Sequence, residues 1–215
     1  MDRINYLREM AIHGYNPEHV GPFHKYMIPW LLSAQAISKE EMIVDIGAGQ
    51  GHCLIPLYRN GWRNLVAVDV DDYNFELFKH KYKIRCFRSD VNSEPLKLED
   101  GSVSAVVCLH LIEHLSKPNN LLFEAFRVLK TGGKIFTVTP DWRKQFKTFW
   151  RDPTHIHPYD KISITRLLRM YNFEPVVHSW GSAYGLGKLQ TYRWVPRLGM
   201  IGKDLLAIGI KSTAA

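Results

Sequence analysis

The sequence predicts a doubly wound α/β fold, in which helices cover both faces of a mostly parallel β-sheet. Ile43, Val44 and Ile46 form a short apolar β-branched run, as in a buried parallel strand. A glycine-rich turn follows, and apolar residues then recur at helical spacing until Gly61. A second apolar run at 65–68 ends in Asp69. A strand, a glycine turn, a helix and another strand in this order are typical of such folds.

The remaining elements follow from apolar spacing and turn residues. Pro29 is expected to open a helix that runs to Ile37, because proline is well placed in a first helical turn. Gly132 and Gly133 are expected to end another helix as a left-handed cap. The residues that indicate the expected helices lie within 2–10, 29–37, 53–58, 75–78, 121–129 and 162–171, and those that indicate the further strands lie within 84–87, 103–109, 134–139, 173–177 and 204–210.

Length and composition indicate one globular domain. The chain has 215 residues, of which 46% are hydrophobic and 23% charged, which is enough for a substantial core. No apolar run approaches the ~18–20 residues of a membrane span, and residues 1–10 lack the apolar core of a signal peptide. Cys53, Cys86 and Cys108 lack C-x-x-C spacing, which indicates reduced core thiols. A cytoplasmic location is therefore expected.

The formal net charge of +7 has two interpretations. It could mark an anionic partner, such as nucleic acid, a phosphorylated substrate or a membrane surface. It could equally be a solvated surface without a specific partner, and the sequence favours this second interpretation. The oligomeric state is not predicted.

The glycine turn has the pattern Asp45-x-Gly47-x-Gly49-x-Gly51, which differs from the dinucleotide fingerprint G-x-G-x-x-G. Glycine is needed where the backbone takes up positive φ and a ligand approaches closely. Asp45 would repel a pyrophosphate at the helix N-terminus unless the ligand also carries positive charge. Asp69, at the tip of the next strand, lies where a ribose diol is bound in doubly wound nucleotide sites.

This pattern resembles the class I S-adenosylmethionine-dependent methyltransferases, particularly the small single-domain ubiquinone and small-molecule methylase group. The resemblance extends over residues 22–211, and 101–140 is its second strong stretch. It implies a Rossmann-like, seven-stranded sheet with an antiparallel last strand, in a single domain over 1–215. It also implies S-adenosylmethionine as the cofactor, whose ammonium and sulfonium suit Asp45. The helices of 1–38 would lie over the cofactor, and 140–160 and 180–203 would be substrate-side loops.

The resemblance also assigns cofactor-binding residues. Asp69 would bind the ribose, and Asp90 would accept a hydrogen bond from the adenine amino group, with Val91 packed on the ring. A carboxylate after a strand is otherwise a common helix cap, so that alternative for Asp90 stays open. The full predicted set is Asp45, Gly47, Ala48, Gly49, Gly51, Asp69, Val70, Asp90, Val91, Leu109 and His110.

His110 follows the fourth strand and lies three and four residues before Glu113 and His114. Three interpretations compete for this group. His110 could be a general base, since imidazole titrates near neutrality. A divalent metal could be held, as some quinone-methylating relatives hold one at a Glu-x-x-Glu-His stretch. Here a histidine replaces the first acid, which disfavours magnesium, and no metal is expected. Glu113 and His114 could simply bond neighbouring loops, which is the favoured interpretation for these two.

The segment 140–160 is rich in aromatic and charged residues without periodicity, which indicates a substrate-facing loop. Its run 152–155 (Asp-Pro-Thr-His) resembles a segment of relatives that methylate sugars and other hydroxylated small molecules. If oxygen is methylated, His155 or His110 is the expected base, oriented by Asp141 or Asp152. The residues 180–203 combine glycines, aromatics and cations, which suit an acceptor pocket, nucleic acid, a membrane interface or a loop folded over the sheet.

The expected function is therefore methyl transfer from S-adenosylmethionine to an oxygen of a small-molecule or glycan-type acceptor. One alternative is a nucleic-acid (RNA) methyltransferase. It is disfavoured because residues 109–112 carry no Asn-Pro-Pro-Tyr or Asp-Pro-Pro-Tyr motif. The other is a non-catalytic module that binds S-adenosylmethionine. A NAD-dependent dehydrogenase fits poorly, given the glycine pattern and Asp45.

Overall fold

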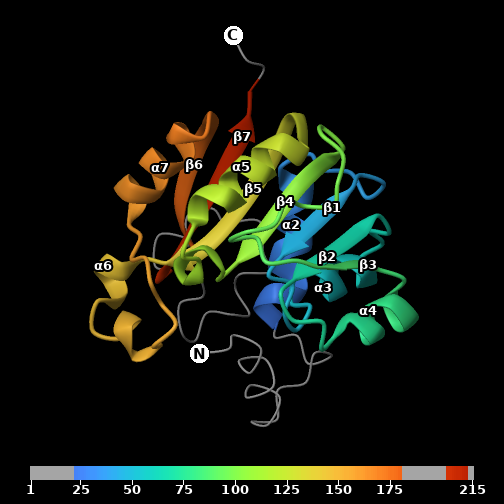
Figure 1. Ribbon diagram of the computed structural model, residues 1–215, viewed down its shortest axis with the longest axis horizontal. Coiled ribbons are helices and arrows are strands. Elements are labelled where there is room, and N and C mark those ends of the chain that lie inside the picture. The colour runs from blue at the N-terminus through green and yellow to red at the C-terminus, as the bar shows by residue number, and fades with distance from the viewer. Residues whose placement is uncertain (1–21, 181–201, 213–215) are drawn as a thin grey trace.

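The computed structural model describes residues 22–180 and 202–212, which form a seven-stranded sheet with helices on both faces (Figure 1). The strand order is β3-β2-β1-β4-β5-β7-β6. All neighbouring pairs from β3 to β5 are parallel, whereas β7 runs antiparallel to both β5 and β6. The predicted fold class is thereby confirmed. The strands are β1 (Ile43–Ile46), β2 (Leu65–Asp69), β3 (Arg85–Arg88), β4 (Val103–Leu109), β5 (Leu129–Pro140), β6 (Phe173–Trp180) and β7 (Asp204–Lys211).

Alternation along the strands divides the core into two layers. Ile43 and Leu65 face the layer that contains α2 (Pro22–Ala34), α3 (Leu54–Arg59) and α4 (Phe75–Tyr82). Val44 and Val66 face the opposite layer, which contains α5 (Pro118–Val128) and α7 (Lys161–Met170). The central strands are apolar at nearly every position because both of their faces are covered.

Two predicted element boundaries were wrong. The helix expected to end at Gly132 and Gly133 ends at Val128, and β5 begins directly at Leu129. The two glycines lie within β5, where its register with β4 shifts. Gly132 has a φ of +75°, so this residue supports a bulge in a strand instead of a helix cap.

The second wrong boundary concerns Pro29, which was expected to open a helix. It lies inside α2, which begins at Pro22. A proline there removes one helical hydrogen bond, but Met27, Ile28 and Leu31 are buried against the sheet layer. Tertiary burial therefore outweighs the local preference for a helix start at Pro29.

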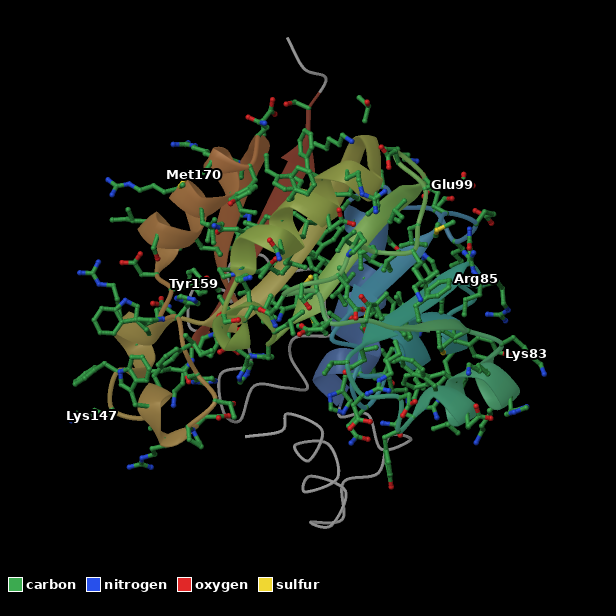
Figure 2. The ribbon with its side chains drawn as sticks, viewed as in Figure 1. Lys83, Arg85, Glu99, Lys147, Tyr159 and Met170 are labelled. Atoms are coloured by element: carbon green, nitrogen blue, oxygen red, sulfur yellow. The ribbon has the colours of Figure 1, made fainter. Side chains whose placement is uncertain are left out.

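The segment 140–160 leaves the carboxyl end of β5 and forms α6 (Trp142–Gln145) and a short 3₁₀ helix, η3 (Phe149–Arg151). In Figure 2, Lys147 marks its outer tip and Tyr159 the point where the chain returns to the body of the molecule. The segment returns by docking on η2 (Ile112–His114), since the amides of Ile156 and His157 both donate to the Glu113 carbonyl. The segment is thus an ordered connection with two short helices and is anchored to η2 by backbone hydrogen bonds.

The antiparallel direction of β7 matters for the site. Its first residue, Asp204, pairs with Pro140 at the end of β5. Asp204 therefore lies at the same edge of the sheet as the carboxyl ends of the parallel strands. In doubly wound folds, ligands bind at this edge.

Several sequence expectations concern residues outside those described, namely the helix at 2–10 and nearly all of the loop 180–203. Among the residues that the structure describes, no helix has both the length and the apolar composition required to cross a bilayer. Cys53, Cys86 and Cys108 are all free thiols, as predicted.

Candidate functional site

The glycine turn after β1 has the backbone geometry that its sequence predicts. Gly47, Gly49 and Gly51 have φ values of +76°, +48° and +78°. A Cβ on Gly51 would lie 2.7 Å from Cε1 of Phe78, and one on Gly47 would lie 3.1 Å from Cδ1 of Leu111. Glycine is therefore required both for backbone conformation and for close packing.

Hydrogen bonds hold this turn against the end of β2. The Gly47 amide donates to the Val68 carbonyl at 2.8 Å. The Gly49 amide donates to Oδ2 of Asp69 at 2.8 Å, while Oδ1 of Asp69 accepts from the amide of Asp71. Asn74 donates to the Gly49 carbonyl at 2.9 Å, a contact that the sequence reasoning missed. Each Asp69 oxygen keeps a further lone pair, so the carboxylate can still accept from a ribose hydroxyl.

Asp45 is buried beneath this turn, with 2% of its surface exposed. Its Oδ1 has no hydrogen-bond partner among the described residues. Burial, followed by the charge of Asp69, raises the pKa of Asp45 to about 8. A buried carboxyl with one oxygen that accepts no hydrogen bond is stabilised by a ligand that brings positive charge. The residues present therefore fit a cationic nucleoside such as S-adenosylmethionine.

Asp90 and Val91 follow β3. Oδ1 of Asp90 accepts from the amide and the side chain of Asn92 at 3.0 and 2.9 Å within a turn, and no helix of the described residues begins there, so Asp90 is not the helix cap that the sequence left open. Val91 is 5% exposed and packs with the apolar core between the sheet and α5, so its side chain has little surface to offer an adenine ring.

His110 lies directly after β4 with a φ of +49°, an unusual value for a non-glycine residue. Its amide donates to the Val138 carbonyl of β5. The imidazole lies between two carboxylates, with Nδ1 3.4 Å from Oε1 of Glu113 and Nε2 4.0 Å from Oδ2 of Asp204. Partial burial lowers the pKa of His110, but Glu113 and then Asp204 raise it, and the net direction is upward. Its side chain is still 43% exposed.

Two residues near His110 were not predicted as site residues. His52, in the glycine turn, has its pKa lowered by burial and then by the charge of His110, which places the two imidazoles near each other. Asp204 is held by a hydrogen bond from Nε2 of Gln145 at 3.0 Å. Asp204 sits at a strand start remote in sequence, so no local pattern indicated that it faces His110.

His155 lies in a different environment from His110. Its Nδ1 bonds to the Phe149 carbonyl at 2.7 Å, and its side chain is only 12% exposed. Oδ2 of Asp152, one of the two acids named from the sequence as a possible orienting group, lies 3.9 Å from its Nε2. Asp141 instead accepts from the amide of Arg143 and caps α6.

His155 also joins Glu113 and His114 in a cluster. One ligating atom from each of these three residues lies within 4.8 Å of the others. The His114 and His155 ring centroids are 4.8 Å apart. The structure thus separates the predicted histidines into His110, at the end of β4, and His155, in this second cluster.

Comparison with known proteins gives consistent results. A family model described as a methyltransferase domain matches residues 21–179. A protein of Mycolicibacterium smegmatis, classed as an S-adenosylmethionine-dependent methyltransferase, is 30% identical over 152 residues, which cover 67% of this chain and 56% of that protein. The ubiquinone biosynthesis O-methyltransferase of Cupriavidus pinatubonensis is 24% identical, with coverage of 63% of this chain and 57% of that one. The chain therefore spans a little over half the length of these two relatives.

Among solved structures, the chain is similar to a Haloferax volcanii methyltransferase seen in complex with the activator Trm112. The TM-score is 0.70 with 16% identity, and the match covers 99% of this chain and 95% of that one. At this identity the likeness supports the fold.

Proposed function

Because this chain belongs to the class I S-adenosylmethionine-dependent methyltransferases, we propose that it transfers a methyl group to an oxygen atom of a small-molecule or glycan-type acceptor. The observation that carries the oxygen assignment is His110, an exposed imidazole held between Glu113 and Asp204 at the ligand-binding edge of the sheet. A hydroxyl acceptor gains from a base in this position, whereas an already nucleophilic acceptor does not need one.

The cofactor supplies an activated methyl group on its sulfonium. This chain's residues would bind and orient it: the turn 47–51 would cradle the amino-acid part above Asp45, and Asp69 would accept from the ribose. Val70, Asp90 and Leu109 would lie next to the rest of the cofactor. Holding donor and acceptor in line, away from water, is the main contribution that such a transfer requires from a protein.

His110 is a better candidate for the base than His155. Its side chain is 43% exposed, against 12% for His155. Nδ1 of His155 is also bonded to the Phe149 carbonyl. Two flanking carboxylates orient the His110 ring and stabilise the imidazolium that forms when it accepts a proton. The name of the Cupriavidus relative, an O-methyltransferase, is consistent with an oxygen acceptor.

Calorimetry tests the cofactor directly. S-adenosylmethionine should bind with one-to-one stoichiometry, and NAD should give no binding heat under the same conditions. Binding of NAD in preference to S-adenosylmethionine would contradict the proposal. A screen of labelled-methyl transfer over sugars, phenols, lipids and nucleic acids then identifies the acceptor. Transfer to RNA alone would favour the nucleic-acid alternative, and binding without any transfer would favour a non-catalytic module.

The role of His110 is tested with His110→Asn, since asparagine tolerates the left-handed backbone of this position. We expect turnover on the acceptor found in the screen to fall by at least about 100-fold, with cofactor affinity nearly unchanged. The matched control is His178→Asn, at an exposed position of β6, which should leave turnover unaltered. Equal turnover of His110→Asn and the control would remove the general-base assignment.

A further inference from the structure

A second group of ligating side chains lies where the segment 149–159 docks on η2. It consists of the Glu113 carboxylate and the imidazoles of His114 and His155, which offer one ligating atom each within 4.8 Å of one another. The docking is fixed by backbone hydrogen bonds from Ile156 and His157 to the Glu113 carbonyl. Glu113 and His114 are neighbours in the sequence, and the docking of the segment 149–159 brings His155 to them.

Glu113 has an unusual environment within this group. Its side chain is fully buried, with 0% exposure. Neither of its carboxylate oxygens accepts a hydrogen bond from any described residue, and Nδ1 of His110 lies 3.4 Å from its Oε1. A buried carboxylate without hydrogen-bond donors is strongly disfavoured unless it is paired or binds a cation.

Hydrogen bonds at the Nδ1 atoms orient the two imidazoles of His114 and His155. Nδ1 of His155 faces the Phe149 carbonyl at 2.7 Å, so it carries the proton and Nε2 carries the lone pair. Nδ1 of His114 lies 2.8 Å from Oγ1 of Thr154, and that hydroxyl donates to Asp152 at 2.6 Å. The hydroxyl hydrogen is thus engaged, and His114 must donate through Nδ1. Such bonds to a carbonyl and to a carboxylate-linked hydroxyl are typical behind metal-ligating histidines.

We propose that Glu113, His114 and His155 hold a divalent transition-metal ion, with Zn²⁺ as the best match to two imidazoles and one carboxylate. Nitrogen and mixed nitrogen–oxygen donors favour Zn²⁺ and Co²⁺ over Mg²⁺ and Ca²⁺, which prefer oxygen. The ion would balance the Glu113 charge and fasten the segment 149–159 to η2, with a fourth position open to water. Small side-chain adjustments would bring the ligating atoms to the metal.

This site differs from the expectation of no metal, which considered His110 as the third ligand. His155 takes that place, and His110 is not part of the group. Glu113 belongs to both groups, but metal binding is measured separately from the base assignment, since it requires neither the cofactor nor an acceptor.

Titration of the metal-free full chain with Co²⁺ tests the proposal, because Co²⁺ reports its coordination by visible absorption. We expect one ion per chain, absorption bands typical of nitrogen and oxygen ligands at low coordination number, displacement by Zn²⁺, and a higher melting temperature with the metal. His155→Ala and His114→Ala should each weaken Co²⁺ binding by at least about 100-fold, and Thr154→Val by about 10-fold as a positioning residue.

The matched control is His80→Ala, which removes an exposed imidazole that pairs with Glu76 on α4 at 2.9 Å. It should leave Co²⁺ affinity unchanged. The proposal is overturned if the wild-type chain binds no Co²⁺ or Zn²⁺ up to about 0.1 mM at neutral pH. It is also overturned if the His155→Ala variant binds as tightly as wild type. Because the wild-type titration stands alone, a ligand variant that fails to fold does not prevent a decision.

Discussion

At the scale of single residues, the glycine turn combines two separate requirements. Gly51 has a φ of +78°, and a Cβ there would meet Phe78 and Ile55 at 2.7 and 3.0 Å. Gly101 has a similar φ of +65°, but nothing lies within 4 Å of its missing Cβ. Substitution of Gly101 therefore tests backbone strain alone, whereas substitution of Gly51 tests strain together with a steric clash.

Gly101→Ala should lower the free energy of unfolding by about 1–2 kcal/mol, the cost of a left-handed alanine. Gly51→Ala should lower it by about 2–5 kcal/mol, because overpacking against Phe78 adds to that strain. Urea unfolding of both variants measures the difference. Equal decreases in the free energy of unfolding would show that the side chains around Gly51 accommodate the added Cβ without loss of stability.

At the scale of elements, α5 holds the loop that precedes β4 through one ionic network. Arg127 donates to the Leu96 and Leu98 carbonyls, each at 2.9 Å, and pairs with Glu124 at 2.6 Å. Glu124 also accepts from the Leu96 amide at 2.7 Å and is largely buried. The network thus connects the helix to the loop through both backbone and side-chain groups.

Arg127→Ala should destabilise the protein by about 2–4 kcal/mol, because it leaves the Glu124 carboxylate buried without its partner. Arg127→Lys should reduce the stability less, since lysine retains the positive charge although it lacks the planar guanidinium and its several donors. The control Arg169→Ala, at an exposed position of α7, should change stability by no more than about 0.5 kcal/mol. Thermal and urea unfolding report all three. A loss at Arg127 no larger than at Arg169 would contradict the role of the network.

At the scale of the whole molecule, buried or partly buried carboxylates gather at the edge of the sheet where the parallel strands end. Asp45 and Asp204 both have their pKa raised, with burial as the first cause. For Asp45 the folded pKa is about 8, against an ordinary value of 3.8. Between these values the unfolded chain has released this proton while the folded chain retains it. The contribution of Asp45 to stability therefore falls as pH rises through this window.

In the absence of cofactor, Asp45→Asn should remove this dependence. The free energy of unfolding of the wild type, relative to the variant, should decrease by about 1 kcal/mol for each pH unit between pH 5 and 7. Urea unfolding at several pH values measures the two curves. Parallel curves would mean that the Asp45 carboxyl is already ionised in the folded protein. The same variant should bind S-adenosylmethionine more weakly, because it lacks the charge that faces the ammonium.

Local patterns in the sequence were sufficient for most of the sheet and for the glycine turn. Runs such as 103–109 are apolar at every position except Ser104 because the strand is covered on both faces, so its burial can be predicted from its residue types. The turn is similarly readable, since its φ values admit glycine far more easily than other residues. The boundaries at Pro29 and Gly132 were missed because burial and strand pairing there outweigh local preference.

The sequence by itself therefore determined the fold class, the glycine turn and the positions of Asp45 and Asp69 at the ends of their strands, since these depend on patterns of residues that are close along the chain. Only the tertiary structure decided which groups surround His110 and His155. Asp204 reaches His110 because β7 runs antiparallel to β5, and His155 reaches Glu113 because the segment after β5 folds back on η2. Contacts between residues so distant in sequence arise from strand pairing and loop docking, which leave no periodic signal in the residues themselves.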